Sequence, residues 1–182
     1  MRKVYCHFSF KRPKDKPGVG YFSVVFFEEA KAENKIARRT VERELWLDHQ
    51  FVTAIQSYEY ALEFIHEWQG VMLSKGIKVV RLVTDNSILA GWIKDPKKNK
   101  DYTEYMNRAI RNYRKGGPKE LALDIELCQV AKINRAYYYC TEKHIENGYR
   151  LSDKCNNKVK ASDGVSVFDI INDDINEPKI NL

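Results

Sequence analysis

The sequence predicts an α/β domain on a mixed five-stranded sheet, in which an antiparallel three-stranded meander precedes parallel strands, with helices on both faces. Three observations support this prediction. Aromatic and β-branched residues are concentrated in short runs within the first 47 residues, between turn-forming ones, as in antiparallel strands. Apolar residues then recur three and four apart over 53–73, which indicates a helix with one buried face. A nearly continuous apolar run at 77–83 is typical of a strand covered on both faces.

The meander is predicted from three segments. Residues 3–10 form a first strand, which ends at a loop that contains two prolines and two glycines. Residues 21–27 form the second strand, and residues 35–47 form a third. The long helix over 53–73 ends near Gly76, and the strand over 77–83 follows it.

The second half of the chain is predicted to contain more helix. Beyond strand 77–83 we expect a short helix at 88–93, then a basic region. A helix over 121–130, a fifth strand over 136–140 and a final helix over 149–160 complete the order β-β-β-α-β-α-α-β-α. We expect one domain over 1–160 and an acidic tail over 161–182, which holds five acidic residues and one lysine.

Composition excludes several classes of protein. Of the 182 residues 43% are apolar and 31% are charged, a balance that can form a core but contains no run long enough to cross a membrane. The start lacks the pattern of a secretory signal. The four cysteines are dispersed without a Cys-x-x-Cys pair, so we expect a cytoplasmic protein in a reducing compartment. Signature motifs of P-loop ATPases, dinucleotide-binding enzymes, serine hydrolases and zinc proteases are absent from the sequence.

Positive charge is concentrated between residues 94 and 119, a segment that contains nine Lys or Arg residues and three acidic residues. A polyanion such as nucleic acid would bind such a segment, although a solvated helix face would have the same composition. Arg108 and Arg111 lie three residues apart, so a helix would place them on one face. The candidate phosphate-binding residues are Lys97, Lys98, Lys100, Arg108, Arg111, Arg114 and Lys115.

Four polar residues stand where chemistry could occur. Asp85 follows the apolar strand 77–83, at the edge where α/β sheets bind ligands, although an aspartate there often caps a helix. Glu59 lies within the long helix and Asp153 within the last one, and either could simply be solvated. His144 lies in the loop before the last helix, where a solvated histidine is common.

Taken together, residues 3 to about 160 resemble the ribonuclease H family. Val83-Thr-Asp85-Asn-Ser87 is similar to the family's Thr-Asp-Ser at the end of strand four, and Ser57-Tyr-Glu59-Tyr-Ala-Leu62 to the Glu-bearing start of its first helix. Gly91-Trp92-Ile93 precedes the basic region, as a Trp-Ile pair does in the family. His144 and Asp153 follow in the family's order. His7 stands where the family has its first aspartate.

The resemblance implies a metal-dependent endoribonuclease that cuts RNA, above all the RNA strand of RNA–DNA hybrids. Glu59, Asp85 and Asp153 would hold two metal ions, with His7 as a replacement ligand and His144 assisting proton transfer or product release. Mg²⁺ or Mn²⁺ would be the metal, and an imidazole ligand would favour Mn²⁺.

The replacement at His7 supports a different hypothesis as well. The chain could be a catalytically degenerate ribonuclease H-like module that binds nucleic acid, or a protein partner through its acidic tail. Exonucleases, resolvases and transposase-type enzymes share the fold, but the meander-first order and the basic insertion favour ribonuclease H.

Overall fold

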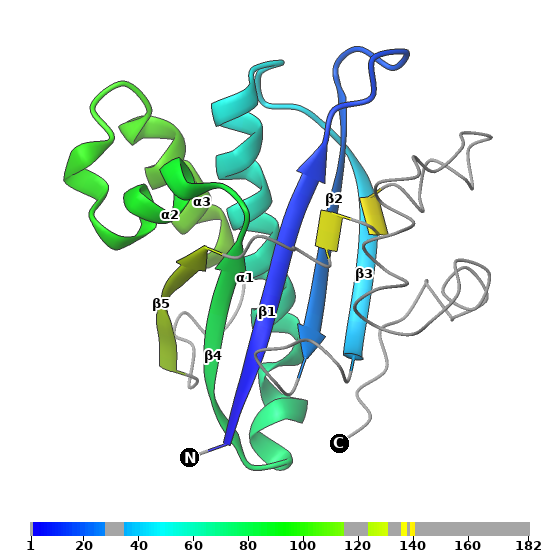
Figure 1. Ribbon diagram of the computed structural model, residues 1–182, viewed down its shortest axis with the longest axis vertical. Helices are drawn as coiled ribbons and strands as arrows, with labels where there is room; N and C mark the ends of the chain where they lie inside the picture. Colours follow the sequence, from blue (N-terminus) through cyan, green and yellow to red (C-terminus); the bar gives the residue numbers. More distant parts are fainter. Residues whose placement is uncertain (1, 28–34, 115–123, 131–135, 138, 141–182) are drawn as a thin grey trace.

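The computed structural model describes residues 2–27, 35–114, 124–130, 136, 137, 139 and 140. One sheet has the order β3-β2-β1-β4-β5 (Figure 1). Its strands are β1 (Arg2–Lys11), β2 (Val19–Phe27), β3 (Lys35–Glu44), β4 (Ile77–Thr84) and β5 (Asp124–Val130). β1 pairs antiparallel with β2 and parallel with β4, so the predicted mixed sheet with an initial meander is confirmed.

α1 (Gln50–Ser74) covers one face of this sheet, and α2 (Ser87–Lys94) and α3 (Thr103–Arg114) lie at one end of it. α1 runs along the face behind the sheet in Figure 1, and α2 begins directly after β4. A short 3-10 turn (Pro96–Lys98) and α3 follow, and α3 packs on α1. Figure 1 shows α2 and α3 as a protrusion beside the N-terminal half of α1, near the end of β4.

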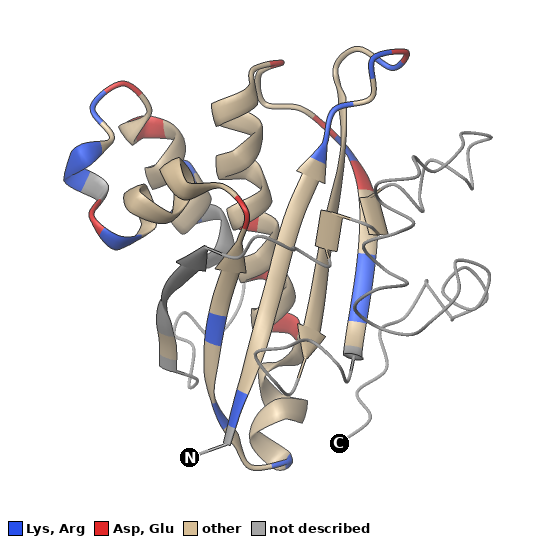
Figure 2. Ribbon diagram, in the orientation of Figure 1, with Lys and Arg blue, Asp and Glu red and all other residues tan. Residues whose placement is uncertain are grey.

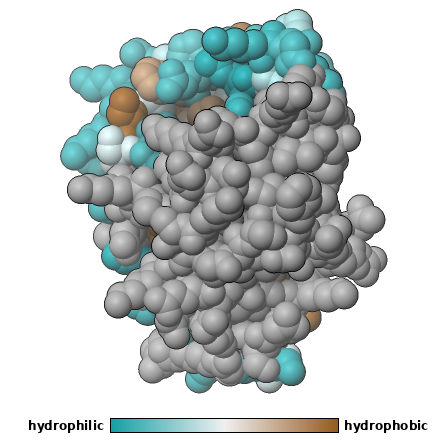
Figure 3. Space-filling model, turned by 45° about the vertical axis from the view of Figure 1, so that its right-hand side comes forward, coloured by the Kyte–Doolittle hydropathy of each residue, from teal (hydrophilic) through white to brown (hydrophobic). Residues whose placement is uncertain are grey.

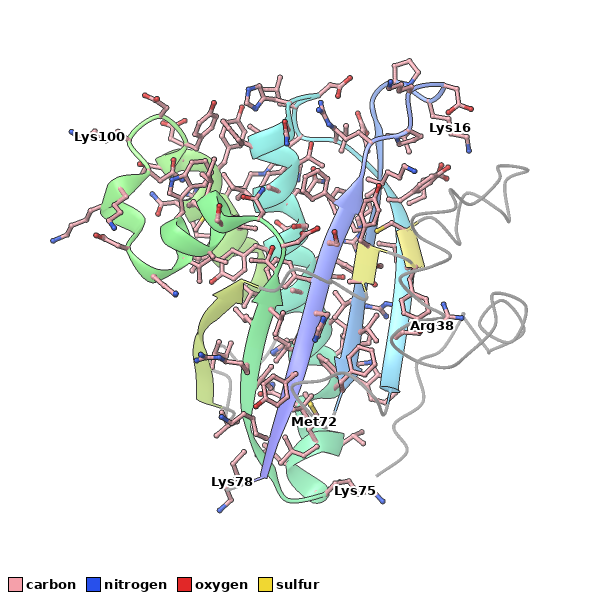
Figure 4. All side chains as sticks on the ribbon, in the orientation of Figure 1. Lys16, Arg38, Met72, Lys75, Lys78 and Lys100 are labelled. Carbon is pink, nitrogen blue, oxygen red and sulfur yellow. The ribbon has the colours of Figure 1, made fainter. Side chains whose placement is uncertain are left out.

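The core lies between α1 and the sheet. Alternate residues of β1 and β2 enter it, because successive side chains of a strand point to opposite faces. Residues of α1 three or four apart meet them from the helix. Each fully buried apolar side chain contributes roughly 1.5–3 kcal/mol relative to exposure. The largest side chains in this core are Phe8, Phe22, Phe26, Tyr60, Phe64, Ile55, Ile65 and, near the far end of the sheet in Figure 4, Met72.

The opposite face of the sheet is contacted by residues 136, 139 and 140. The Ser23 hydroxyl donates a hydrogen bond to the carbonyl of Ala136, and the Thr40 hydroxyl donates to that of Tyr139 at 3.3 Å. The guanidinium of Arg38, on β3 in Figure 4, lies 4.4 Å from the centre of the Tyr139 ring. Polar strand residues on this face are therefore buried by a chain segment that follows them by about a hundred residues.

Two glycines shape the connection from β1 to β2. Gly18 has φ +81°, in the left-handed region that glycine adopts without a steric penalty. Its carbonyl accepts a hydrogen bond from Leu45 N–H at 2.9 Å. A Cβ on Gly20 would lie 2.6 Å from Cδ2 of Leu45, so no larger residue fits there without movement. The glycines thus bring the start of β2 against the end of β3.

Two predictions for the later chain are wrong. Residues 124–130 form β5, parallel to β4, where the sequence predicted a helix over 121–130. Residues 136, 137, 139 and 140 are helical, where it predicted a strand. The predicted last helix and the acidic tail lie outside the described residues. No helix in the described ranges is long and apolar enough to cross a membrane.

Candidate functional site

A cleft of about 600 Å³ opens where β1 and β4 end. Because these two strands are parallel neighbours, their carboxyl ends share one edge of the sheet, which is the edge where α/β folds bind ligands. The cleft is lined by the end of β1 and the residues after it, the first residues of α1, the turn after β4 and Tyr137. These residues are Ser9, Phe10, Lys11, Arg12, Gln50, Phe51, Asp85, Asn86, Ser87, Ile88 and Tyr137.

Asp85 lines this cleft with an exposed side chain. The neighbouring residue, Asn86, caps α2: its side-chain oxygen accepts a hydrogen bond from Leu89 N–H at 3.0 Å. Thr84 Oγ1 in turn accepts from Asn86 N–H at 3.1 Å. Since Asn86 provides the cap, Asp85 is not needed for it, and the sequence-based alternative of a capping aspartate does not apply.

His7 does not line the cleft. It pairs with Val83 across the β1–β4 ladder, so the residue level with Asp85 is Ser9, two positions further along β1. The imidazole is 2% exposed and lies 5.1 Å from the Phe27 ring, centre to centre. Two strand residues span about 7 Å, so His7 lies about 7 Å along β1 from the position level with Asp85. The β1 residues that line the cleft are Ser9, Phe10 and Lys11.

Glu59 lies on another side of α1. Its carboxylate is near Arg43 on β3: the hydrogen bond from Arg43 to Glu63 is the main cause of that guanidinium's raised pKa, burial opposes it, and Glu59 adds a smaller increase. The strands β3 and β4 are three places apart in the sheet, about 14 Å. Glu59 also follows Phe51 by eight residues, about 12 Å along a helix axis. Glu59 is therefore not among the described residues that line the cleft with Asp85.

The start of α1 contributes neutral groups to the cleft. Gln50 and Phe51 line it, and the first turn of the helix contains no acidic residue. His49 caps this helix, because its Nδ1 accepts a hydrogen bond from Phe51 N–H at 3.1 Å. Rings of His49, Phe51, Trp92 and Tyr102 pack together with centres 5.4–5.8 Å apart, which joins α1 to the protrusion.

The described donors do not suit a two-metal centre. Hard divalent cations take several oxygen ligands, chiefly carboxylates. Within the described part of the chain no group of three His, Cys, Asp or Glu side chains could hold a metal ion, and Asp85 is the one carboxylate among the described residues of the cleft. Lys11 and Arg12 line the same space. Two other predicted site residues, His144 and Asp153, lie outside the described residues.

The basic residues lie on the protrusion. Lys97, Lys98, Lys100, Arg108 and Arg111 are exposed, and Figure 2 shows positive charge along the 3-10 turn and the following loop. In Figure 4 Lys100 points outward from the molecule. Hydrophilic residues also gather along the upper rim in Figure 3, the end at which β1 and β4 finish. Lys115 and the side chain of Arg114 lie outside the described part.

Met106 and Ala109 bury one face of α3 against the core. The ring of Tyr105 stacks on Trp46, with centres 6.5 Å apart. The outer face borders a second cavity of about 720 Å³, which Arg108 and Arg111 help to line. The helix thus combines an apolar contact with α1 and a basic face, as the spacing of its arginines predicted.

Sequence reasoning missed most of the cleft. Lys11 and Arg12 were included in neither the site nor the basic region, and Tyr137 was assigned to a strand. Successive side chains of a strand point to opposite faces, so Ser9 and Lys11 lie on the same face of β1 as His7. This alternation could have indicated Ser9 and Lys11 as candidate site residues.

Comparison with protein-family models gave no match, and a search of curated proteins gave none either. Solved structures are similar in fold. A ribonuclease H1 from the halophilic archaeon Halobacterium salinarum is 13% identical with a TM-score of 0.50, over 71% of this chain and 85% of its own. The N-terminal ribonuclease H domain of a Mycobacterium tuberculosis protein, solved as a fusion with maltose-binding protein, is 11% identical with a TM-score of 0.50, over 82% of this chain and 100% of its own. The meander, the parallel β1–β4 pair and these similarities together show that the chain has the ribonuclease H-like fold.

Proposed function

We propose that this chain binds nucleic acid, with an RNA–DNA hybrid as the preferred duplex, in the cleft at the ends of β1 and β4. The observation that carries the proposal is the composition of the cleft, whose described residues include two cationic side chains and one carboxylate. The start of α2 lines the cleft, and the end of α2 leads into the basic 3-10 turn. A duplex carries a dense row of phosphates, so a positive cleft beside a positive protrusion offers it a continuous surface. The hybrid is chosen because both similar structures are ribonucleases H.

Fluorescence anisotropy with labelled hybrid, double-stranded RNA, double-stranded DNA and single strands would test this proposal. We expect binding that weakens steeply as salt rises, because counterions released from phosphates drive association. We also expect the hybrid to bind more tightly than double-stranded DNA. If no nucleic acid binds at low ionic strength, the proposal is wrong. The alternative would then be a module that binds a protein partner through its acidic tail.

A second candidate function is metal-dependent cleavage of RNA in hybrids, with Mg²⁺ or Mn²⁺. The exposed Asp85 at the carboxyl end of β4 favours it. The further carboxylate ligands that a two-metal site needs would have to come from outside the described residues. The sequence predicts Asp153 as one of them. Hybrid cleavage should then require a divalent metal, and Asp85→Asn and Asp153→Asn should each abolish it. Folded protein that cleaves no hybrid with either metal would contradict this function.

A further inference from the structure

The cleft has a charge balance opposite to that of a cation site. We propose that Lys11 and Arg12 supply its positive charge, so that the cleft holds a backbone phosphate without a divalent cation. The inference rests on the proposed function, since it assigns the ligand group and the source of charge at that same cleft. It follows from the side chains of the cleft, which suit an anion better than a metal ion.

Lys11 is placed to meet an anion. It is the last residue of β1, it lines the cleft, and its Nζ lies 6.0 Å from the centre of the Tyr137 ring. A ring beneath an ammonium group holds it in position without neutralising its charge. Lys11, Asp85 and Tyr137 all line this cleft.

Arg12 can exchange its present partner. Its Nη1 lies 3.0 Å from Oδ1 of Asp48, and both side chains are partly exposed to solvent, at 34% and 54%. Exposed ion pairs of this kind contribute little to stability, so little is lost when the pair opens. A guanidinium also binds phosphate through two parallel hydrogen bonds, which a single point charge cannot do. A phosphate in the cleft would therefore compete well with Asp48.

Neutral groups around the two cations support the same ligand. Ser9, Gln50 and Ser87 offer hydrogen-bond donors to the cleft. Both α1 and α2 begin at the cleft, and neither has an acidic residue in its first turn. The start of a helix carries partial positive charge, which adds to that of Lys11 and Arg12. Among the described residues that line the cleft, Asp85 is the one acidic side chain, and it opposes an anion there.

The test measures affinity for a short labelled RNA–DNA hybrid at low ionic strength, in EDTA and in Mg²⁺. The intact chain should bind at least as tightly in EDTA as in Mg²⁺. Lys11→Ala should weaken binding about tenfold, the typical effect of losing a charge-assisted hydrogen bond. Lys78→Ala is the matched control, because Lys78 is exposed at the opposite end of β4 (Figure 4) and its loss should change affinity by less than about twofold. Lys11→Arg keeps the charge and should keep the affinity.

Asp85→Asn gives a test of opposite sign that does not depend on the Lys11 variants folding. Removing one repulsive charge about 6 Å from a phosphate in water should tighten binding about threefold. If the carboxylate instead held a bridging metal ion, the same substitution would weaken binding.

Three results would overturn the inference alone: binding that requires Mg²⁺, weaker binding by Asp85→Asn, or a Lys11→Ala effect no larger than that of Lys78→Ala. Absence of any binding in both buffers would overturn the proposed function and this inference with it. Circular dichroism of each variant confirms that it is folded.

Discussion

The guanidinium of Arg108 lies 4.3 Å from the centre of the Trp46 ring. Arg108 belongs to the basic face of α3, and Trp46 follows β3, so this contact joins the protrusion to the body of the domain. The arginine that the sequence assigns to phosphate binding therefore also has a packing role. Its removal should affect stability as well as affinity.

We expect Arg108→Ala to lower the free energy of unfolding by about 0.5–1 kcal/mol, the usual contribution of a cation–π contact near the surface. Arg111→Ala should change stability by less than half of that, because its side chain is exposed and has one long hydrogen bond within its own helix. Urea denaturation of the two variants measures the difference. Equal stability of both would show that the Trp46 contact contributes nothing.

The basic protrusion should determine the salt dependence of binding. Replacement of Arg108, Arg111, Arg114 and Lys115 by alanine should weaken binding to all sequences alike. Each lost phosphate contact should flatten the log–log salt slope by roughly 0.9 for B-form DNA. Affinities measured over a series of salt concentrations give this slope. An unchanged slope in the folded quadruple variant would show that this segment does not contact the phosphate backbone.

Two substitutions of His49 test how much its N-cap hydrogen bond to α1 contributes to stability. His49→Asn keeps a side-chain acceptor for the first turn and should leave stability nearly unchanged. His49→Ala removes the acceptor and should cost about 1 kcal/mol of unfolding free energy. Thermal or urea unfolding measures both. A loss as large in His49→Asn as in His49→Ala would instead assign the contribution of His49 to its ring contacts with Phe51 and Tyr102.

Cys140 should resist thiol reagents while the chain is folded. Burial raises its pKa from 9.0 to about 12, against a smaller lowering by the hydrogen bond with Ser23. The reactive thiolate is then about one in ten thousand thiols at pH 8. Because the unfolded thiol ionises at lower pH than the folded one, this group costs stability as pH rises from about 9 to about 12. Alkylation followed by peptide mass spectrometry checks the prediction, with urea-unfolded protein as the reactive control. Fast labelling of Cys140 at pH 8 in native protein would contradict it.

The sequence predicted the first two thirds of the fold well, because the apolar residues of each element there recur at a clear interval. Alternation gives β1 and β2, and intervals of three and four give α1. Residues 121–130 include three Leu, one Ala and one Glu, which favour helix, but pairing of Asp124–Val130 with the open edge of β4 makes a strand more stable there. The tyrosines of the segment 136–140 favour a strand. Residues 136 and 139 are instead helical and pack on the polar face of β2 and β3.

The candidate site was predicted less well, for a geometric reason. Asp85 was found because it directly follows a buried strand. His7 does not line the cleft, because it lies two residues before Ser9 on β1, a separation of about 7 Å on the same face of the sheet. Glu59 does not line the cleft, because it follows Phe51 by eight residues, about 12 Å along the helix axis. Its role as a metal ligand stays a prediction.

The central position of β1 has a consequence for how the chain folds as it is made. β1 leaves the ribosome before its partner β4, which begins roughly 65 residues after β1 ends, or about 3–13 s later at ordinary rates of translation. During that interval β1 can pair with β2 along one edge, while its other edge waits for β4. The other edge of β1 exposes unpaired backbone groups beside apolar side chains, a combination that promotes association with other chains. Slow translation before Ile77, or a chain truncated there, should therefore increase aggregation of this protein more than changes later in the chain.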